Sequence, residues 1–196
     1  MDDARTRRAL TFRCTGCGNC CRDTWICLTD AELRRLVDGI RRPAHEIVTF
    51  VAHDDITFDA RHPWWVRFDE GRRVMVLQHR GDQCQYLRDD DLCGVYEHRP
   101  LLCREHPWAV TLSDSGAVEK VRTGRIGECP NAWDGHVTKR ELGLLARLRW
   151  RESDAYIAKV EAWNRRRGPG RTPEAFLRWL GFDLPADSCV PAADAG

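Results

Sequence analysis

The chain lacks any long apolar segment. No hydrophobic run approaches the roughly 18 residues that a membrane-spanning helix needs. Its first residues, MDDARTRRALTFRC, carry charge but have neither the apolar core nor the cleavage site of a secretory signal. We therefore expect a soluble cytoplasmic protein with no membrane partner.

An excess of charge of one sign is also absent. The 196 residues include 31 Lys and Arg against 30 Asp and Glu, which gives a formal net charge of +1. No global positive field attracts nucleic acid, so nucleic acid is not an expected partner. Apolar residues make up 42% of the chain, too many for a disordered protein, and the length fits about one domain with an appendage.

Cysteine, in contrast, is abundant, with ten residues. The first five lie between residues 14 and 27 and the next three between 84 and 103, followed by Cys129 and Cys189. A cytoplasmic chain of this length does not need disulfides for stability. Clustered cysteines in a reducing compartment more often bind metal or carry out redox chemistry.

The densest group is Cys14-x-x-Cys17-x-x-Cys20-Cys21. Two-residue gaps let the chain turn so that thiolates face one point, where their mutual repulsion favours a thiolate-binding metal such as zinc or iron. The spacing resembles a ferredoxin loop, but Thr24 occupies the fourth ligand position. Adjacent side chains diverge, so we expect Cys20 to join Cys14 and Cys17, and Cys21 to face the second group or a second metal.

The second group begins with CQYL at 84–87 and continues with CGVYEHRPLLCREHP at 93–107. Together with the first group, it resembles the YkgJ-type cysteine-cluster proteins, a zinc- or iron-chelating CxxCxxCC family that also includes flagellin lysine N-methylases. The resemblance covers about residues 11–135, with Cys129-Pro130 as its last element. The matching positions are Cys14, Cys17, Gly18, Cys20, Cys21, Cys84, Leu87, Cys93, Tyr96, Glu97, Arg99, Pro100, Cys103, Arg104 and Pro107. No cofactor motif for methyl transfer is present, so methylase activity is not carried over.

The resemblance implies eight metal ligands: Cys14, Cys17, Cys20, Cys21, Cys84, Cys93, Cys103 and Cys129. Eight thiolates could form two four-sulfur sites. Alternatively, they could form one closed four-sulfur site and one open three-sulfur site, with one thiol left free. Cys27 and Cys189 fall outside the matched spacing and are expected not to be ligands. His106 stands where the family usually has an aromatic residue, which predicts a packing role, with a nitrogen ligand as the alternative.

Two arginines, Arg99 and Arg104, flank Cys103. A metal bound by four thiolates is net negative, and nearby guanidinium groups would offset that charge, so we predict that both contact the cofactor. The alternative is a helix-capping role or a surface ion pair with Glu97 or Glu105.

Local patterns predict an α+β fold. We expect a small irregular cysteine-cluster metal-binding domain with short hairpins at 1–136, followed by a helical extension and tail at 137–196. The expected strands are one at 10–13 and those of two hairpins, at 64–77 and 108–123. Two helices are expected to begin at capping boxes: one runs from Thr29/Glu32 to Gly39, and a long one follows Thr138/Glu141. Two short helices are also expected, one from Pro43 that carries Val48 and Val51 inward and one from Thr172-Pro173.

The functional hypothesis is a redox or modifying enzyme that acts at an incompletely ligated iron site. An iron–sulfur cluster or iron is preferred, because of the CxxCxxC loop and the Cys129-Pro130 element, and zinc is the alternative metal. The competing hypothesis is a non-catalytic, zinc-stabilised protein-interaction module, and a metal carrier with labile sites is a third. The sequence leaves open whether the substrate is a small molecule or a protein, and what the oligomeric state is.

Overall fold

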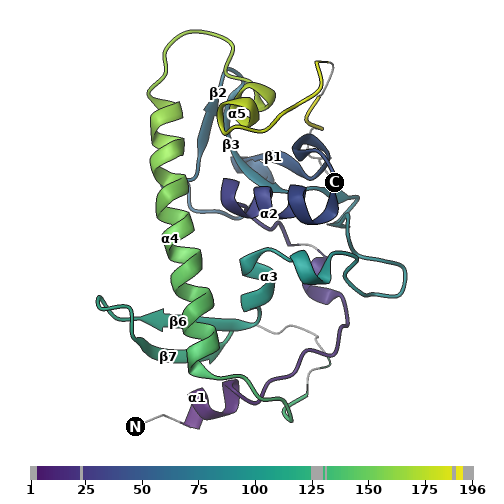
Figure 1. The fold of residues 1–196 in the computed structure, drawn as a ribbon, viewed down its shortest axis with the longest axis vertical. Helices are drawn as coiled ribbons and strands as arrows, with labels where there is room; N and C mark the ends of the chain where they lie inside the picture. The colour runs from purple at the N-terminus through teal and green to yellow at the C-terminus, as the bar shows by residue number, and fades with distance from the viewer. Residues whose placement is uncertain (1–3, 23, 125–129, 131, 187–188, 192–196) are drawn as a thin grey trace.

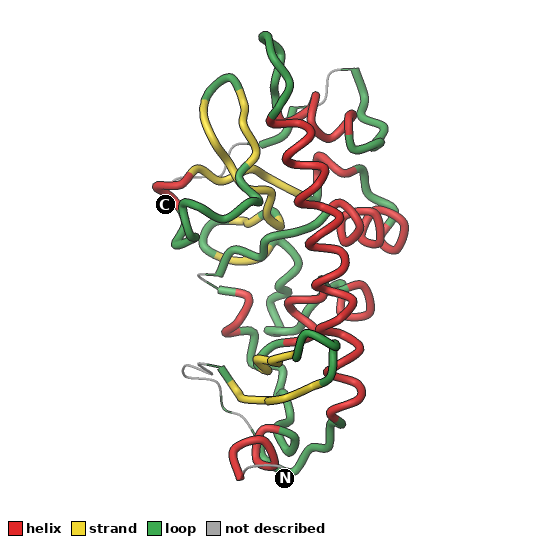
Figure 2. The backbone as a smooth tube through the Cα atoms, turned by 90° about the vertical axis from the view of Figure 1, so that its left-hand side faces the viewer, coloured by secondary structure: helices red, strands yellow, loops and turns green. Residues whose placement is uncertain are grey.

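One long helix runs along most of the molecule (Figures 1 and 2). The computed structural model describes residues 4–22, 24–124, 130, 132–186 and 189–191. Helix α4 (Lys139–Asn164) begins at the predicted capping box, in which Thr138 Oγ1 accepts a hydrogen bond from Glu141 N at 3.2 Å and Glu141 Oε2 accepts one from Thr138 N at 2.7 Å. This reciprocal bonding satisfies two N–H groups that a helix start otherwise leaves free.

The C-terminal half of α4 packs against a three-stranded antiparallel sheet. The strand order is β1 (Val48–Ala52), β3 (Gly71–Leu77), β2 (Val66–Phe68). Helices α2 (Asp30–Ile40) and α5 (Pro173–Trp179) share the main core with one face of this sheet. The alternate side chains of the strands form a smaller core on the opposite face, as the two-residue period of a strand requires.

The N-terminal half of α4 packs against a separate hairpin. Strands β6 (Trp108–Leu112) and β7 (Val118–Thr123) form it, and α1 (Ala4–Ala9) contacts β7. Thr6 Oγ1 donates a hydrogen bond to Val121 O at 3.1 Å, and Ala9 joins the apolar cluster of this end.

The middle of the molecule consists of short elements. Helix α3 (Leu101–Glu105) contacts α4, and a two-residue pair of strands, β4 (His79–Arg80) and β5 (Gln83–Cys84), precedes it. The described residues also form four 3-10 turns: η1 (Asn19–Cys21), η2 (Ala44–Glu46), η3 (His53–Asp55) and η4 (Tyr96–His98).

The predicted α+β class, both hairpins and the three capped helices are confirmed. Two local predictions are wrong. The helix expected from Pro43 is only the turn η2, because Val48 and Val51 pair with β3. The strand expected at 10–13 is reduced to one bridge between Arg13 and Ala132, after the unpredicted helix α1.

Helix α4, which belongs to the predicted extension at 137–196, packs against several elements of the predicted 1–136 domain. It contacts α2, α3 and β2 as well as the β6–β7 hairpin. The division at residue 136 stays a prediction.

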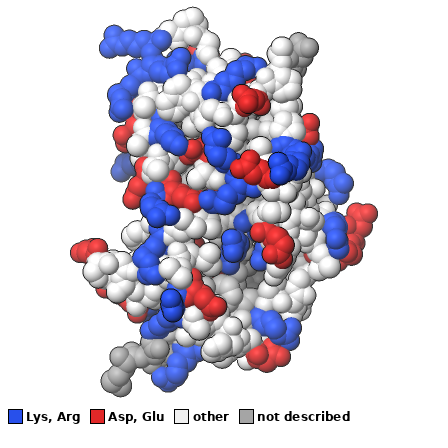
Figure 3. Space-filling model, viewed as in Figure 1, with Lys and Arg blue, Asp and Glu red and all other residues white. Residues whose placement is uncertain are grey.

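The described part of the chain contains no helix of the length and apolarity that a membrane crossing demands. On the face drawn in Figure 3, basic and acidic side chains are interspersed, in keeping with the balanced composition.

Candidate metal centre

The first cysteine loop depends on two glycines with left-handed backbone angles. Gly16 has φ 71° and Gly18 has φ 70°, a region that side chains disfavour. A Cβ on Gly18 would lie 3.0 Å from Asp91 O and 3.0 Å from the Leu87 side chain. The loop therefore turns tightly and packs closely against the segment that carries the second cysteine group.

An ion pair also joins the two cysteine groups. Arg22 pairs with Asp91, and its Nη1 donates a hydrogen bond to Cys17 O at 3.4 Å. The backbone of Arg22 also forms a bridge with Gln83, next to Cys84. The first loop and the second group thus lie side by side, although about 70 residues separate them in the chain, as Figure 1 shows.

The second group brings its cysteines in from three separate segments. Cys84 lies on β5 and is 6% exposed, and Cys103 lies on α3. Cys93 forms a backbone bridge with Leu87, while Gly94 N donates a hydrogen bond to Tyr86 O at 2.8 Å. These backbone contacts fold the segment between Cys84 and Cys93 back on itself.

Five thiols from the two groups influence one another. A hydrogen bond between Cys20 and Cys21 lowers the pKa of Cys20 to about 6 and raises that of Cys21. Burial raises the pKa of Cys84 and of Cys103, and negative charge on Cys20 and Cys93 raises both further. Cys20, Cys21, Cys84, Cys93 and Cys103 therefore converge on one region.

This convergence does not amount to a finished coordination shell. Within the residues that the structure describes, no three His, Cys, Asp or Glu side chains are placed to hold one metal ion. Cys14 is exposed, and its sulfur accepts a hydrogen bond from Gly16 N at 3.4 Å, while Cys129 lies outside the described residues. All donors that do converge are sulfurs, the set that zinc and iron prefer over magnesium or calcium.

Comparison with known protein families agrees with this donor chemistry. The family model CxxCxxCC, described as "Putative zinc- or iron-chelating domain", matches residues 13–124, more than half of the chain. The chain belongs to the CxxCxxCC family. No curated protein and no solved structure matched the chain.

The CxxCxxCC match contains seven of the eight predicted ligands and ends before Cys129. It supports metal binding by the cysteine groups and leaves the choice between zinc and iron open. The eight-ligand assignment stays a prediction. Cys27 lies apart from the converging thiols, where burial raises its pKa to about 12, and Cys189 is exposed at the other end of the chain.

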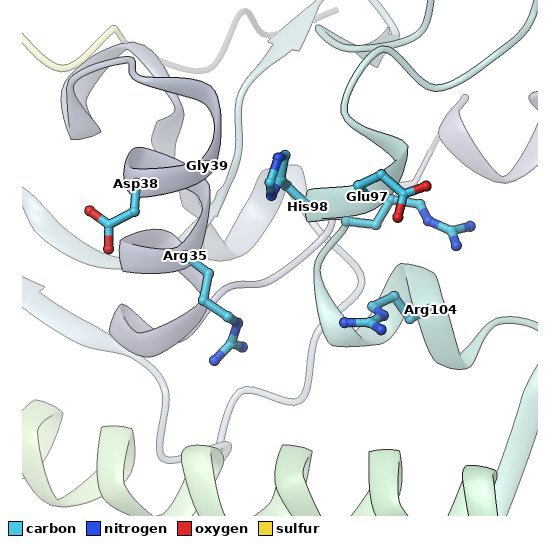
Figure 4. Close-up of a pocket in the computed structure, with 7 residues that line it drawn as sticks. Arg35, Asp38, Gly39, Glu97, His98 and Arg104 are labelled. Atoms are coloured by element: carbon cyan, nitrogen blue, oxygen red, sulfur yellow. The ribbon is translucent and has the colours of Figure 1, made fainter.

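Arg35, Arg99 and Arg104 of the CxxCxxCC domain line a cavity beside α3 (Figure 4). The cavity has a volume of about 320 Å³. The Arg99 guanidinium stacks 3.4 Å above the Tyr96 ring, and its charge helps to lower the pKa of Cys20, after the larger effect of Cys21. Arg104 and Arg35 point into the same space between α2 and α3 in Figure 4.

The predicted cofactor role of Arg99 and Arg104 stays a prediction. Among the residues that the structure describes, neither arginine forms the alternative ion pair with Glu97 or Glu105. Instead Arg99 Nε donates to Tyr96 O at 2.8 Å, and Glu105 pairs with Arg149. His98 also faces this cavity, and its ring occupies the space where a Cβ on Gly39 would lie, 2.3 Å from Nδ1.

His106 ends helix α3 as its C-cap. Burial lowers the pKa of its imidazole. The effect favours the neutral ring, which suits both packing and ligation, so the choice between these roles stays open.

The sequence did not indicate that the buried carboxylate of Glu32 supports the site. Glu32 Oε2 accepts hydrogen bonds from Thr29 N at 3.0 Å and Thr29 Oγ1 at 3.1 Å, and Oε1 accepts one from Leu101 N at 2.8 Å. Glu32 therefore fixes the start of α3, two residues before Cys103. The sequence signalled only its capping role.

Proposed function

We propose that this chain binds iron, as a single ion or an iron–sulfur cluster, and that the centre serves a redox or modifying enzyme. The observation that carries the proposal is the convergence of Cys20, Cys21, Cys84, Cys93 and Cys103 from separate segments. The preference for iron over zinc rests on the CxxCxxC spacing of the first loop.

The neighbouring residues suit a negatively charged centre. Arg99 acts electrostatically on Cys20, and Arg104 follows Cys103 directly. These guanidinium groups would offset the charge of the thiolates and so adjust the centre's reactivity. Bound iron would supply one-electron or Lewis-acid chemistry. The cavity lined by Arg99 and Arg104 would give a reactant access to this side of α3.

Metal content and spectra of anaerobically purified protein test the proposal. We expect iron and visible absorption, together with at least one cysteine thiol that a small alkylating agent reaches in the metal-loaded protein. A colourless protein with zinc and no reachable thiol among the eight would instead support the non-catalytic interaction module. Closed four-coordinate sites leave no position for a substrate.

Serine variants test the ligand set with matched controls. Cys17→Ser and Cys103→Ser should lose metal, whereas Cys27→Ser and Cys189→Ser should retain it in full. The controls remove a sulfur of the same size from positions outside the eight predicted ligands. Equal metal loss in all four variants would contradict the assignment.

A further inference from the structure

A second cavity, of about 580 Å³, lies where Leu102 of α3 meets Arg149 and Ser153 of α4. Its walls come from residues 24–27, from the loop between β1 and β2, and from α3 and α4. The volume lies within the range of small-molecule sites, roughly 300–1,000 Å³. None of the seven predicted metal ligands that the structure describes lines it.

Aromatic side chains held in place form much of the wall. Trp25 stacks on His79 with ring centroids 3.9 Å apart. Trp64 Nε1 donates a hydrogen bond to Ser153 Oγ at 3.2 Å, and Phe58 packs edge-on against Trp65 at 5.6 Å. Rings that are already fixed lose little conformational entropy on binding, which favours a flat apolar ligand.

Arg149 supplies a polar contact at the same wall. Its Nε pairs with Glu105, and within the described chain its terminal Nη groups donate no hydrogen bond to another residue. Glu32, also at the wall, has both oxygens engaged by Thr29 and Leu101. The cavity therefore offers the guanidinium donors of Arg149, while the carboxylate of Glu32 is already engaged.

The charges of the lining favour an uncharged ligand. Glu105 already balances Arg149, and Asp55 and Glu32 add acidic groups to the wall. Burial raises the pKa of Cys27 to about 12 and lowers that of His62, so these two lining groups are partly shielded from water. These carboxylates would repel a bound anion. Among the described lining residues, Arg149 is the cation that could offset that repulsion, and it is already paired with Glu105.

We propose that this cavity binds a small, uncharged, planar aromatic compound whose carbonyl oxygen accepts hydrogen bonds from Arg149. Its ring contacts the aromatic wall formed by Trp25, Phe58 and Trp64. Binding does not depend on the identity of the metal. That such a compound is the substrate of the metal centre rests on the function proposed above.

Calorimetric titration with 2-naphthamide and 2-naphthoate tests this proposal on the full chain as purified. The two probes share a ring and differ in charge. We expect one saturable naphthamide site per chain and naphthoate binding weaker by about tenfold or more, the scale of one charge-related contact. Equal or tighter naphthoate binding, or no saturable naphthamide binding, would overturn the proposal.

Variants locate the site. Arg149→Gln keeps a donor toward Glu105 and should weaken naphthamide binding about tenfold, whereas Arg151→Gln, an exposed neighbour on α4, should not change it. Phe58→Ala should also weaken naphthamide binding. Because Phe58 lies in a loop, this variant tests the site even if Arg149→Gln does not fold. Unchanged affinity in folded Phe58→Ala would refute the site.

Metal analysis of the same samples separates the two proposals. Naphthamide binding by protein that lacks iron would support the cavity and contradict the proposed iron enzyme. Protein that contains iron but does not bind naphthamide would support iron binding and contradict the cavity proposal.

Discussion

Replacing Glu32 with alanine should loosen helix α3 and the cysteine that it carries. The carboxylate caps α2 through Thr29 and at the same time accepts the backbone N–H of Leu101. Leu101 is 2% exposed, so water does not readily replace the lost acceptor. The variant therefore removes a cap and leaves a buried donor unpaired.

The magnitude follows from these contacts. Loss of a cap costs about 1 kcal/mol, and an unsatisfied buried donor costs about 1–3 kcal/mol. Burial raises the pKa of Glu32, so keeping it charged at neutral pH has a cost that the variant relieves. We expect a net decrease in the free energy of unfolding of about 2 kcal/mol.

The raised pKa also fixes the sign of the pH dependence. A carboxyl group whose pKa is higher in the folded than in the unfolded protein stabilises the fold most below the unfolded value, about 4.3. That contribution decreases as pH rises through the folded pKa. The stability difference between the native protein and Glu32→Ala should therefore be larger near pH 4 than near pH 7.

Hydrogen exchange and metal release provide the assay. In Glu32→Ala, the Leu101 amide should exchange faster and a chelator should remove metal faster. Glu141→Ala is the matched control, because it removes the equivalent capping box of α4 without touching α3. If both variants show the same Leu101 exchange and the same metal release, the reasoning about Glu32 is wrong.

Three further predictions concern the metal and the outer contacts. Removing the metal with a strong chelator should change the near-UV dichroism and increase protease cleavage within residues 1–136, and no change after confirmed metal loss would contradict this. Cys21→Ser should retain metal near Cys14 and Cys17 but alter thiol reactivity or the metal count per chain, as metal analysis and alkylation will show. Asp69→Ala should lower the melting temperature at pH 7, and this effect should decrease as the solution is acidified below the ordinary pKa of an aspartate, about 3.9. Backbone hydrogen bonds from Gly170 and Arg171 lower the pKa of Asp69, and such stabilisation is lost as pH falls through the folded pKa; an effect that does not decrease on acidification would contradict this.

Elements with local signals could be predicted from the sequence. Helices α2 and α4 begin at capping boxes, whose partners lie three residues apart, and both boxes form as expected. The hairpin of β2 and β3 forms within the expected range 64–77 and turns at Asp69 and Glu70. In each case the residues that determine the structure are neighbours in the chain.

Strand β1 shows where local reading fails. Pro43 suits a helix start, and the apolar residues that follow fit a helical stripe. The β-branched residues at 48, 49 and 51 instead pair with β3, more than 20 residues later, and become buried. Pairing with the distant strand β3 makes this segment a strand rather than a helix, and no pattern within the segment itself indicates that pairing.

The candidate site divides in the same way. Cysteine spacing indicated metal binding, since four thiols within eight residues rarely occur for another reason. The contacts that place the second group are distant in sequence: Arg22 with Asp91, and Glu32 with Leu101. Neither pair has a spacing that could have revealed it.

The relative strengths of these contacts indicate what holds the cysteine loops together. The pair of Arg22 and Asp91 is well exposed, and such pairs contribute at most about 1 kcal/mol. The single bond from Leu101 to Glu32 contributes a similar amount. Metal binding by cysteine sites contributes about 10 kcal/mol or more to folding. The polar contacts therefore set the position of the loops, whereas the bound metal would supply most of the free energy that joins them, which is why its removal should affect structure before any test of activity.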